Sequence, residues 1–114
     1  MKRRRMQSYE LIEDRMKEIY LQFYDETYKD VNGLDFKTKE LIAISASLIA
    51  KCQNCLKGHI KKAIKAGATF QELSETITIA TGVNAASIVD QTDLANFDMD
   101  VLNMLEETKK NTPK

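Results

Sequence analysis

The chain has 114 residues, of which 43% are hydrophobic and 30% are charged, values typical of a globular protein rather than a disordered one. Its 17 basic residues balance its 17 acidic ones, so the overall charge gives no reason to expect a nucleic acid or an acidic membrane as partner. No apolar run approaches the ~20 residues of a membrane span, and the basic start MKRRR is followed by no apolar signal segment. We therefore expect one cytoplasmic domain over residues 1–114.

Four glycines, one proline and the lack of an alternating apolar pattern predict an all-α bundle of about five to six helices. The first helix is expected from about Gln7 to Tyr28, after a disordered tail over residues 1–6. Tyr20, Tyr24 and Tyr28 form an i, i+4 stripe on it. The stripe is interpreted as a core edge with its hydroxyls at the wet side, with a subunit contact as the alternative.

A central antiparallel pair of helices is predicted next. The first of the two can be capped by Asp35, and its residues 41–50 are apolar nearly all round, which indicates burial. The second is expected to begin between Cys52 and Asn54 and to stop at Gly67.

The remainder of the chain is predicted to be helical as well. Thr69 and Glu72 have the spacing of a capping box, and Gly82 and Asn84 predict a break or kink. A weaker helical pattern over 85–97 is followed by a short helix from Met99 to about Glu107, capped by Asp98. Residues 109–114 are expected to be a disordered tail.

The chemistry is concentrated in the central pair, which holds both cysteines and the only histidine. Cys52, Cys55 and His59 have spacings that place them on one helix face. A helix N-terminus stabilises a thiolate, and His59 could accept the thiol proton. Two thiols at this spacing can also close a disulfide after one is oxidised. The sequence therefore predicts a redox-active dithiol that needs no cofactor.

Two other interpretations of the same residues stay open. Cys52, Cys55, His59 and Glu40 could hold zinc, although structural zinc usually takes four Cys or His ligands. The cysteines could also be simple core packing. Glu40 lies about 18 Å along its helix from Cys52 and can reach His59 only if the second helix folds back antiparallel.

The pattern Glu40, Cys52, Cys55, His59 resembles the Glu…Cys-x-x-Cys-x-x-x-His motif of the alkylhydroperoxidase D-like branch of the carboxymuconolactone decarboxylase family. The following AIKAGATFQELSETITIA is similar to that family's continuation, so that the resemblance covers about residues 36–82. Asn54 stands where well-characterised members carry a second histidine, and Asn cannot carry a proton at neutral pH.

The resemblance implies an all-α enzyme in which Cys52 and Cys55 cycle between dithiol and disulfide while Glu40 and His59 relay protons. It points to Cys55 as the attacking thiol with Cys52 resolving, whereas in many Cys-x-x-Cys enzymes the first cysteine is the nucleophile. It implies a hydroperoxide or disulfide substrate, a lipoyl- or thioredoxin-type dithiol reductant, no metal, and assembly into trimers or hexamers. Decarboxylation of a carboxymuconolactone-type acid, and a non-enzymatic scaffold of the same fold, are the alternatives.

Overall fold

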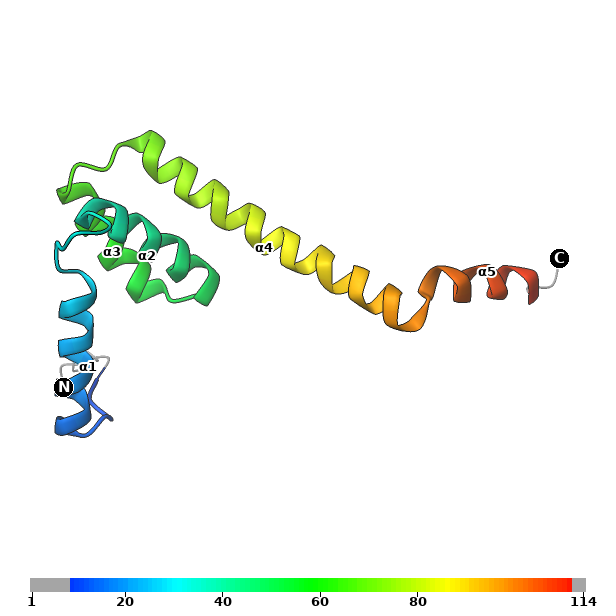
Figure 1. The fold of residues 1–114 in the computed structure, drawn as a ribbon, viewed down its shortest axis with the longest axis horizontal. Helices are drawn as coiled ribbons and strands as arrows, with labels where there is room; N and C mark the ends of the chain where they lie inside the picture. Colours follow the sequence, from blue (N-terminus) through cyan, green and yellow to red (C-terminus); the bar gives the residue numbers. More distant parts are fainter. Residues whose placement is uncertain (1–8, 112–114) are drawn as a thin grey trace, which may run out of the picture.

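The computed structural model describes residues 9–111, which form five helices and, within that range, no strand. The helices are α1 (Asp14–Thr27), α2 (Phe36–Ala50), α3 (Gln53–Lys65), α4 (Phe70–Met99) and α5 (Val101–Asn111), as Figure 1 shows. The all-α prediction is confirmed. The first six residues of the chain, for which a tail was predicted, lie outside the described range.

The antiparallel α2–α3 hairpin is the centre of the fold, and local interactions fix both of its ends. Asp35 caps α2 through a 2.7 Å hydrogen bond from the Thr38 amide to its carboxylate. Lys51 turns the chain in the left-handed conformation, with φ 58°, and Cys52 begins the next helix as its N-cap. Gly67, with φ 94°, ends the segment in a conformation that favours glycine. The predicted boundaries of this pair are confirmed.

Helix α4 begins with the predicted capping box, in which Thr69 and Glu72 satisfy each other's backbone amides. The break predicted at Gly82 and Asn84 is wrong, because α4 continues without interruption to Met99. A single glycine weakens a helix by only about 1 kcal/mol relative to alanine, which the surrounding helical hydrogen bonds can outweigh. The break occurs instead at Asp100, whose φ is 55°.

The last part of the chain forms an arm. The first half of α4 packs on α2, whereas its second half and α5 extend away from the other helices (Figure 1). The terminal helix begins at Val101 rather than Met99, and it includes residues 109–111, which were expected to be disordered. The radius of gyration is 22.2 Å, whereas a compact domain of this length has about 13 Å.

Helix α1 extends away from the hairpin (Figure 1), and a few side chains hold its C-terminal end. Lys39 of α2 donates to the backbone carbonyls of Thr27 and Lys29, at 2.8 and 2.7 Å. One tyrosine of α1 and the tyrosine at its C-cap stack near His59, as described below. The helix begins at Asp14, later than predicted.

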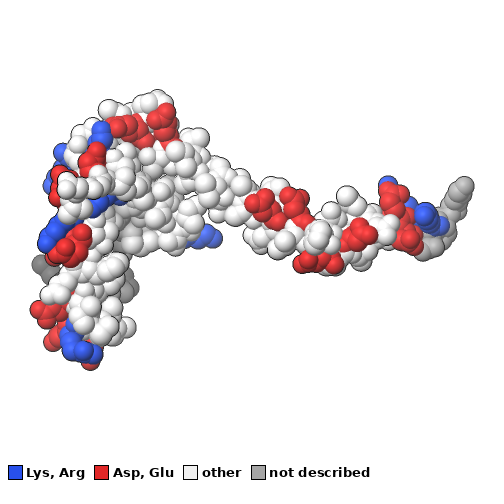
Figure 2. Space-filling model, in the orientation of Figure 1, with Lys and Arg blue, Asp and Glu red and all other residues white. Residues whose placement is uncertain are grey.

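The apolar core of the isolated chain is small. Its buried apolar side chains among the described residues are Ala43, Ile44, Ala63 and Ala80. The expectation that α2 is buried all round is wrong in this form of the chain, because Ile42 and Ile49 remain 49% and 46% exposed. The visible surface where α4 leaves the hairpin is largely free of charge (Figure 2), and residues 76–89 contain no Asp, Glu, Lys or Arg. Among the helices described here, none has the length and apolar character needed to cross a membrane.

Candidate active site

The two cysteines lie where α2 ends and α3 begins, and they are joined by a disulfide with the Cα atoms 5.3 Å apart. Cys52 is the N-cap of α3, and its sulfur accepts a 3.3 Å hydrogen bond from the Cys55 amide. Cys55, in the first turn, is exposed, whereas Cys52 is half-buried. A helix N-terminus stabilises negative charge, so this contact favours a thiolate on Cys52 when the pair is reduced. Solvent reaches the pair mainly at Cys55.

One turn further along α3, His59 is paired with Glu40 of α2. His59 Nδ1 lies 2.6 Å from Glu40 Oε2. The Glu40 side chain is fully buried and that of His59 is 11% exposed. With Nδ1 donating its proton to the carboxylate, Nε2 is left as the acceptor nitrogen of the ring. Because α3 folds back antiparallel to α2, two residues that are 19 positions apart in the sequence come into contact. This is the condition under which Glu40 was expected to reach His59.

The carboxylate of Glu40 is not fully satisfied. Its Oε1 atom is buried and has no hydrogen-bond partner among residues 9–111. A buried carboxylate with a single partner is costly to maintain, so it is rarely found where only packing is at stake. This combination of burial and pairing is common in sites that position a histidine for proton transfer.

Two tyrosine rings, Tyr24 of α1 and Tyr28 at its C-cap, cover the imidazole. The ring centroids of Tyr28 and Tyr24 lie 5.5 and 6.3 Å from that of His59, and both rings are within 30° of parallel to it. Lys62 of α3 donates a 2.6 Å hydrogen bond to the Tyr24 hydroxyl, and this bond raises the pKa of Lys62. Burial, followed by the neighbouring Tyr24 and Glu40, raises the pKa of Tyr28.

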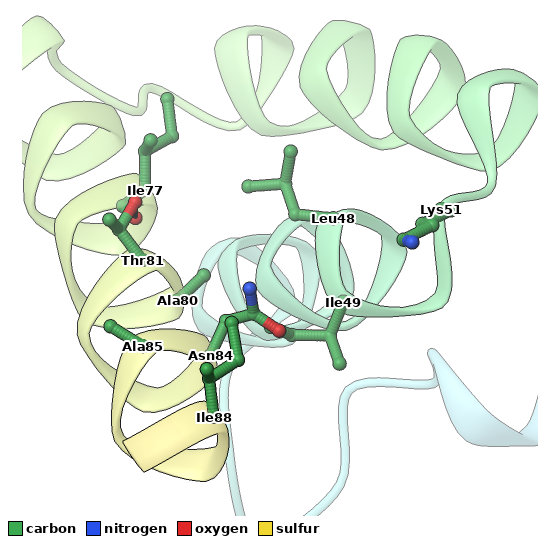
Figure 3. A pocket seen from close by; sticks show the side chains of 9 residues that line it. All are labelled: Leu48, Ile49, Lys51, Ile77, Ala80, Thr81, Asn84, Ala85 and Ile88. Atoms are coloured by element: carbon green, nitrogen blue, oxygen red, sulfur yellow. Dashed lines mark hydrogen bonds between the residues drawn. The ribbon is translucent and has the colours of Figure 1, made fainter. Parts of the chain in front are cut away.

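Two open grooves flank the end of α2. One, of about 400 Å³, lies beside the disulfide and is lined by Ser47, Leu48, Lys51, Cys52, Gln53 and Leu56. The other, of about 360 Å³, lies between α2 and α4 (Figure 3). In it, Leu48 and Ile49 of α2 face the stretch of α4 from Ile77 to Ile88. The two grooves share Leu48 and Lys51, so the surface beside the disulfide continues into an apolar trough.

The structure brings Glu40 and His59 together and bonds Cys52 to Cys55. Within the described part of the chain, no group of three His, Cys, Asp or Glu residues converges as a metal site would require. Sequence reasoning did not assign Tyr24, Tyr28 or Lys62 to the site. The i, i+4 tyrosine stripe was a signal for the first two, but nothing local to the sequence indicated that they face His59.

Comparisons with known proteins agree with this architecture. The chain is 37% identical over 55 residues to uncharacterized protein 4 in the cox locus of Paracoccus denitrificans, a match over 48% of this chain and 50% of that protein. The chain thus spans about half the length of the curated relative it matches.

Two solved structures share the fold. A Methanobacterium thermoautotrophicum protein aligns with a TM-score of 0.65 and 25% identity, over 74% of this chain and 95% of that one. A Thermotoga maritima carboxymuconolactone decarboxylase family protein, for which a part in the antioxidative response has been suggested, aligns with a TM-score of 0.60 and 26% identity. That alignment covers 88% of this chain and 99% of the other. The model of the carboxymuconolactone decarboxylase family matches residues 14–91, well over half of the sequence, and the chain belongs to that family.

Proposed function

We propose that this protein is a thiol–disulfide oxidoreductase that reduces organic hydroperoxides. The observation that carries the proposal is the buried Glu40–His59 pair, with its 2.6 Å contact, one helical turn beyond a Cys-x-x-Cys disulfide. A disulfide alone could be structural, and a buried hydrogen bond between Glu and His alone could serve packing. Their conjunction supports a reactive dithiol with its own proton acceptor.

The reaction balances with the residues of the site and two small reactants. The Cys55 thiolate attacks the peroxide oxygen, releases the alcohol and becomes a sulfenic acid. The Cys52 sulfur then displaces water and closes the disulfide. One hydroperoxide and two thiols thus give one alcohol, one water and one disulfide, and a dithiol reductant restores the thiols while it is itself oxidised.

The two sulfurs have different surroundings, which supports different roles. Cys55 is exposed and is one turn before His59, so it is accessible to peroxide and close to a base. Cys52 accepts the amide hydrogen bond at the N-cap. During reductive cleavage the better-stabilised thiolate is the better leaving group. An incoming dithiol is therefore expected to attack Cys55 and to release Cys52.

Single cysteine variants test the proposal. Reduced Cys52→Ser protein should consume about one equivalent of cumene hydroperoxide and then stop as a sulfenic acid, because it lacks the resolving thiol. Cys55→Ser should be inactive. With an asymmetric disulfide probe, Cys52→Ser should trap a mixed disulfide on Cys55, detectable by mass spectrometry. Full turnover by a Cys52→Ser/Cys55→Ser double variant would refute the proposal.

The reductant is tested by offering dihydrolipoamide and reduced thioredoxin separately and following disulfide reduction in the wild type. Both are dithiols, which suit a disulfide target. Such reductants are maintained in the cytoplasm, where we place the activity. Decarboxylation of a carboxymuconolactone-type acid by the double cysteine variant would instead support the activity from which the family takes its name.

We also propose that the protein works as a homo-oligomer, of which a trimer or a hexamer is the expected form. An isolated chain leaves Phe97 85% exposed and Leu102 66% exposed along the arm, with the apolar trough between α2 and α4 open as well. Exposed apolar area of this extent is typical of surfaces that another subunit covers. A second copy supplies both the apolar arm and the trough, so the two can satisfy each other.

A further inference from the structure

We propose that Tyr24, Tyr28 and Lys62 are positioning residues for His59: the two rings fix the plane of the imidazole, and Lys62 holds the Tyr24 ring in place through its hydroxyl group. The inference rests on the proposed function for the role of His59 as a base. It goes beyond that function because it gives the C-terminal end of α1 a role in the site, although α1 otherwise makes few contacts with the hairpin.

The ring contacts carry the first part of the argument. Tyr28 and Tyr24 lie 4.8 Å apart, centroid to centroid, and both present a face to the imidazole. An imidazole held only by its Nδ1 hydrogen bond can still rotate about that contact. Flat rings stacked against it at 26° and 29° restrict such rotation and direct Nε2 in one direction. Both tyrosines are half-buried, so their rings also keep water from the Glu40–His59 hydrogen bond.

The contacts of Lys62 with Tyr24 carry the second part. Its ammonium group is held by the Tyr24 hydroxyl at 2.6 Å and lies 4.9 Å from the centroid of the Tyr24 ring. The position of Lys62 is half-buried. A charge-assisted hydrogen bond and a cation–π contact to the same side chain restrict the motion of that ring. Lys62 therefore helps to hold Tyr24 against His59.

The groups around the imidazole come from three helices and the residue that caps one of them. They are Glu40 from α2, Tyr24 from α1, Tyr28 from the C-cap of α1, and Lys62 from α3. The cover of the imidazole therefore depends on how the end of α1 lies against the hairpin.

His59 is the only histidine, so its ring protons give a single set of NMR signals that can be followed without any catalytic assay. In Lys62→Met, the ring-current displacement of the His59 signals should decrease, because the Tyr24 ring has lost its anchor. Tyr24→Phe removes the same hydrogen bond but keeps the ring, and should cause a decrease of similar size. Lys61→Met, one residue away and exposed, is the matched control and should give the His59 signals of the wild type.

The ring contacts are tested with Tyr28. Tyr28→Leu should remove the ring-current displacement of the His59 signals and lower the rate of peroxide reduction about tenfold through misorientation of the base. Tyr28→Phe keeps the ring, so the His59 signals and the rate of peroxide reduction should stay close to those of the wild type. This variant distinguishes loss of the ring from failure to fold. Matched helicity by circular dichroism is required of every variant.

Identical His59 signals in Lys62→Met and Lys61→Met would overturn the anchoring role of Lys62, and unchanged His59 signals in Tyr28→Leu would overturn the role of the rings. These results are separable from failure of the proposed function. If the wild type reduced no peroxide, the NMR signals would still show whether these residues position His59.

Discussion

Replacement of Glu40 by glutamine isolates what the buried carboxylate contributes. The substitution keeps the size and shape of the side chain, and the amide oxygen can still accept a hydrogen bond from His59 Nδ1. Only the negative charge is lost from a position that is completely buried and 2.6 Å from the imidazole. A difference between Glu40→Gln and wild type therefore reports on the charge rather than on packing.

The magnitude follows from the strengths of the two kinds of hydrogen bond. A hydrogen bond to a charged group contributes about 1.5–3 kcal/mol, and a neutral one about 0.5–1.5 kcal/mol, so that the loss is about 1–2 kcal/mol. If this loss falls on the protonated imidazole formed during attack, the rate decreases about 5- to 30-fold, because about 1.4 kcal/mol corresponds to a factor of ten. Stability should change less, since the glutamine leaves no ionised oxygen without a partner.

The assay is stopped-flow reaction of the reduced protein with cumene hydroperoxide at neutral pH, accompanied by the thermal midpoint of each variant. Glu75→Gln, an exposed position on α4, is the control for loss of one negative charge. Equal rates for wild type and Glu40→Gln, with the fold intact, would refute the role of Glu40 in orienting His59. Equal losses in Glu40→Gln and Glu75→Gln would show that only net charge matters.

Three further predictions concern the fold around the site. Ile44 is fully buried in α2, so Ile44→Val should lower the unfolding free energy by about 0.5–1.5 kcal/mol and Ile44→Ala by about 2–5 kcal/mol in urea titrations; equal stabilities would contradict its place in the core. The Thr38 amide holds the pKa of Asp35 below its usual range, so this carboxylate stabilises the folded state above the ordinary Asp pKa, and the contribution is lost as pH falls through the lowered value. The thermal midpoint of wild type should therefore exceed that of Asp35→Asn at neutral pH and converge with it in acid, whereas a constant difference would exclude the charge effect. Phe97→Asp, on the apolar arm, should reduce the mass measured by light scattering to that of a smaller species, which exposed Gln91→Asp should not do; an unchanged mass would show that the arm is not the interface.

The sequence was most informative where local rules apply. Asp35 and the Thr69–Glu72 box identified the starts of two helices because capping depends on side chains within three residues of the backbone amides they satisfy. Gly67 identified an end because glycine alone adopts its φ without strain. The same local reasoning failed at Gly82, where a modest propensity cost was outweighed by a continuous helix, and at Asp100, a left-handed residue that no glycine marks.

In the candidate site, too, local spacing could be predicted from the sequence, whereas contacts between distant segments could not. The spacing of Cys55 and His59 placed them about one turn apart on α3, with Cys52 at its N-cap, because that relation needs only the period of one helix. The contact of Glu40 with His59 required α3 to fold back antiparallel to α2. The sequence allowed this arrangement, and the tertiary structure shows it, with His59 Nδ1 2.6 Å from Glu40 Oε2. The cover of Tyr24 and Tyr28 over the imidazole depended on how α1 docks on the hairpin, and docking is fixed by contacts between distant segments that no short sequence pattern encodes. The sequence alone therefore identified the candidate reactive groups and their helices, while packing between helices decided which of those groups contact one another.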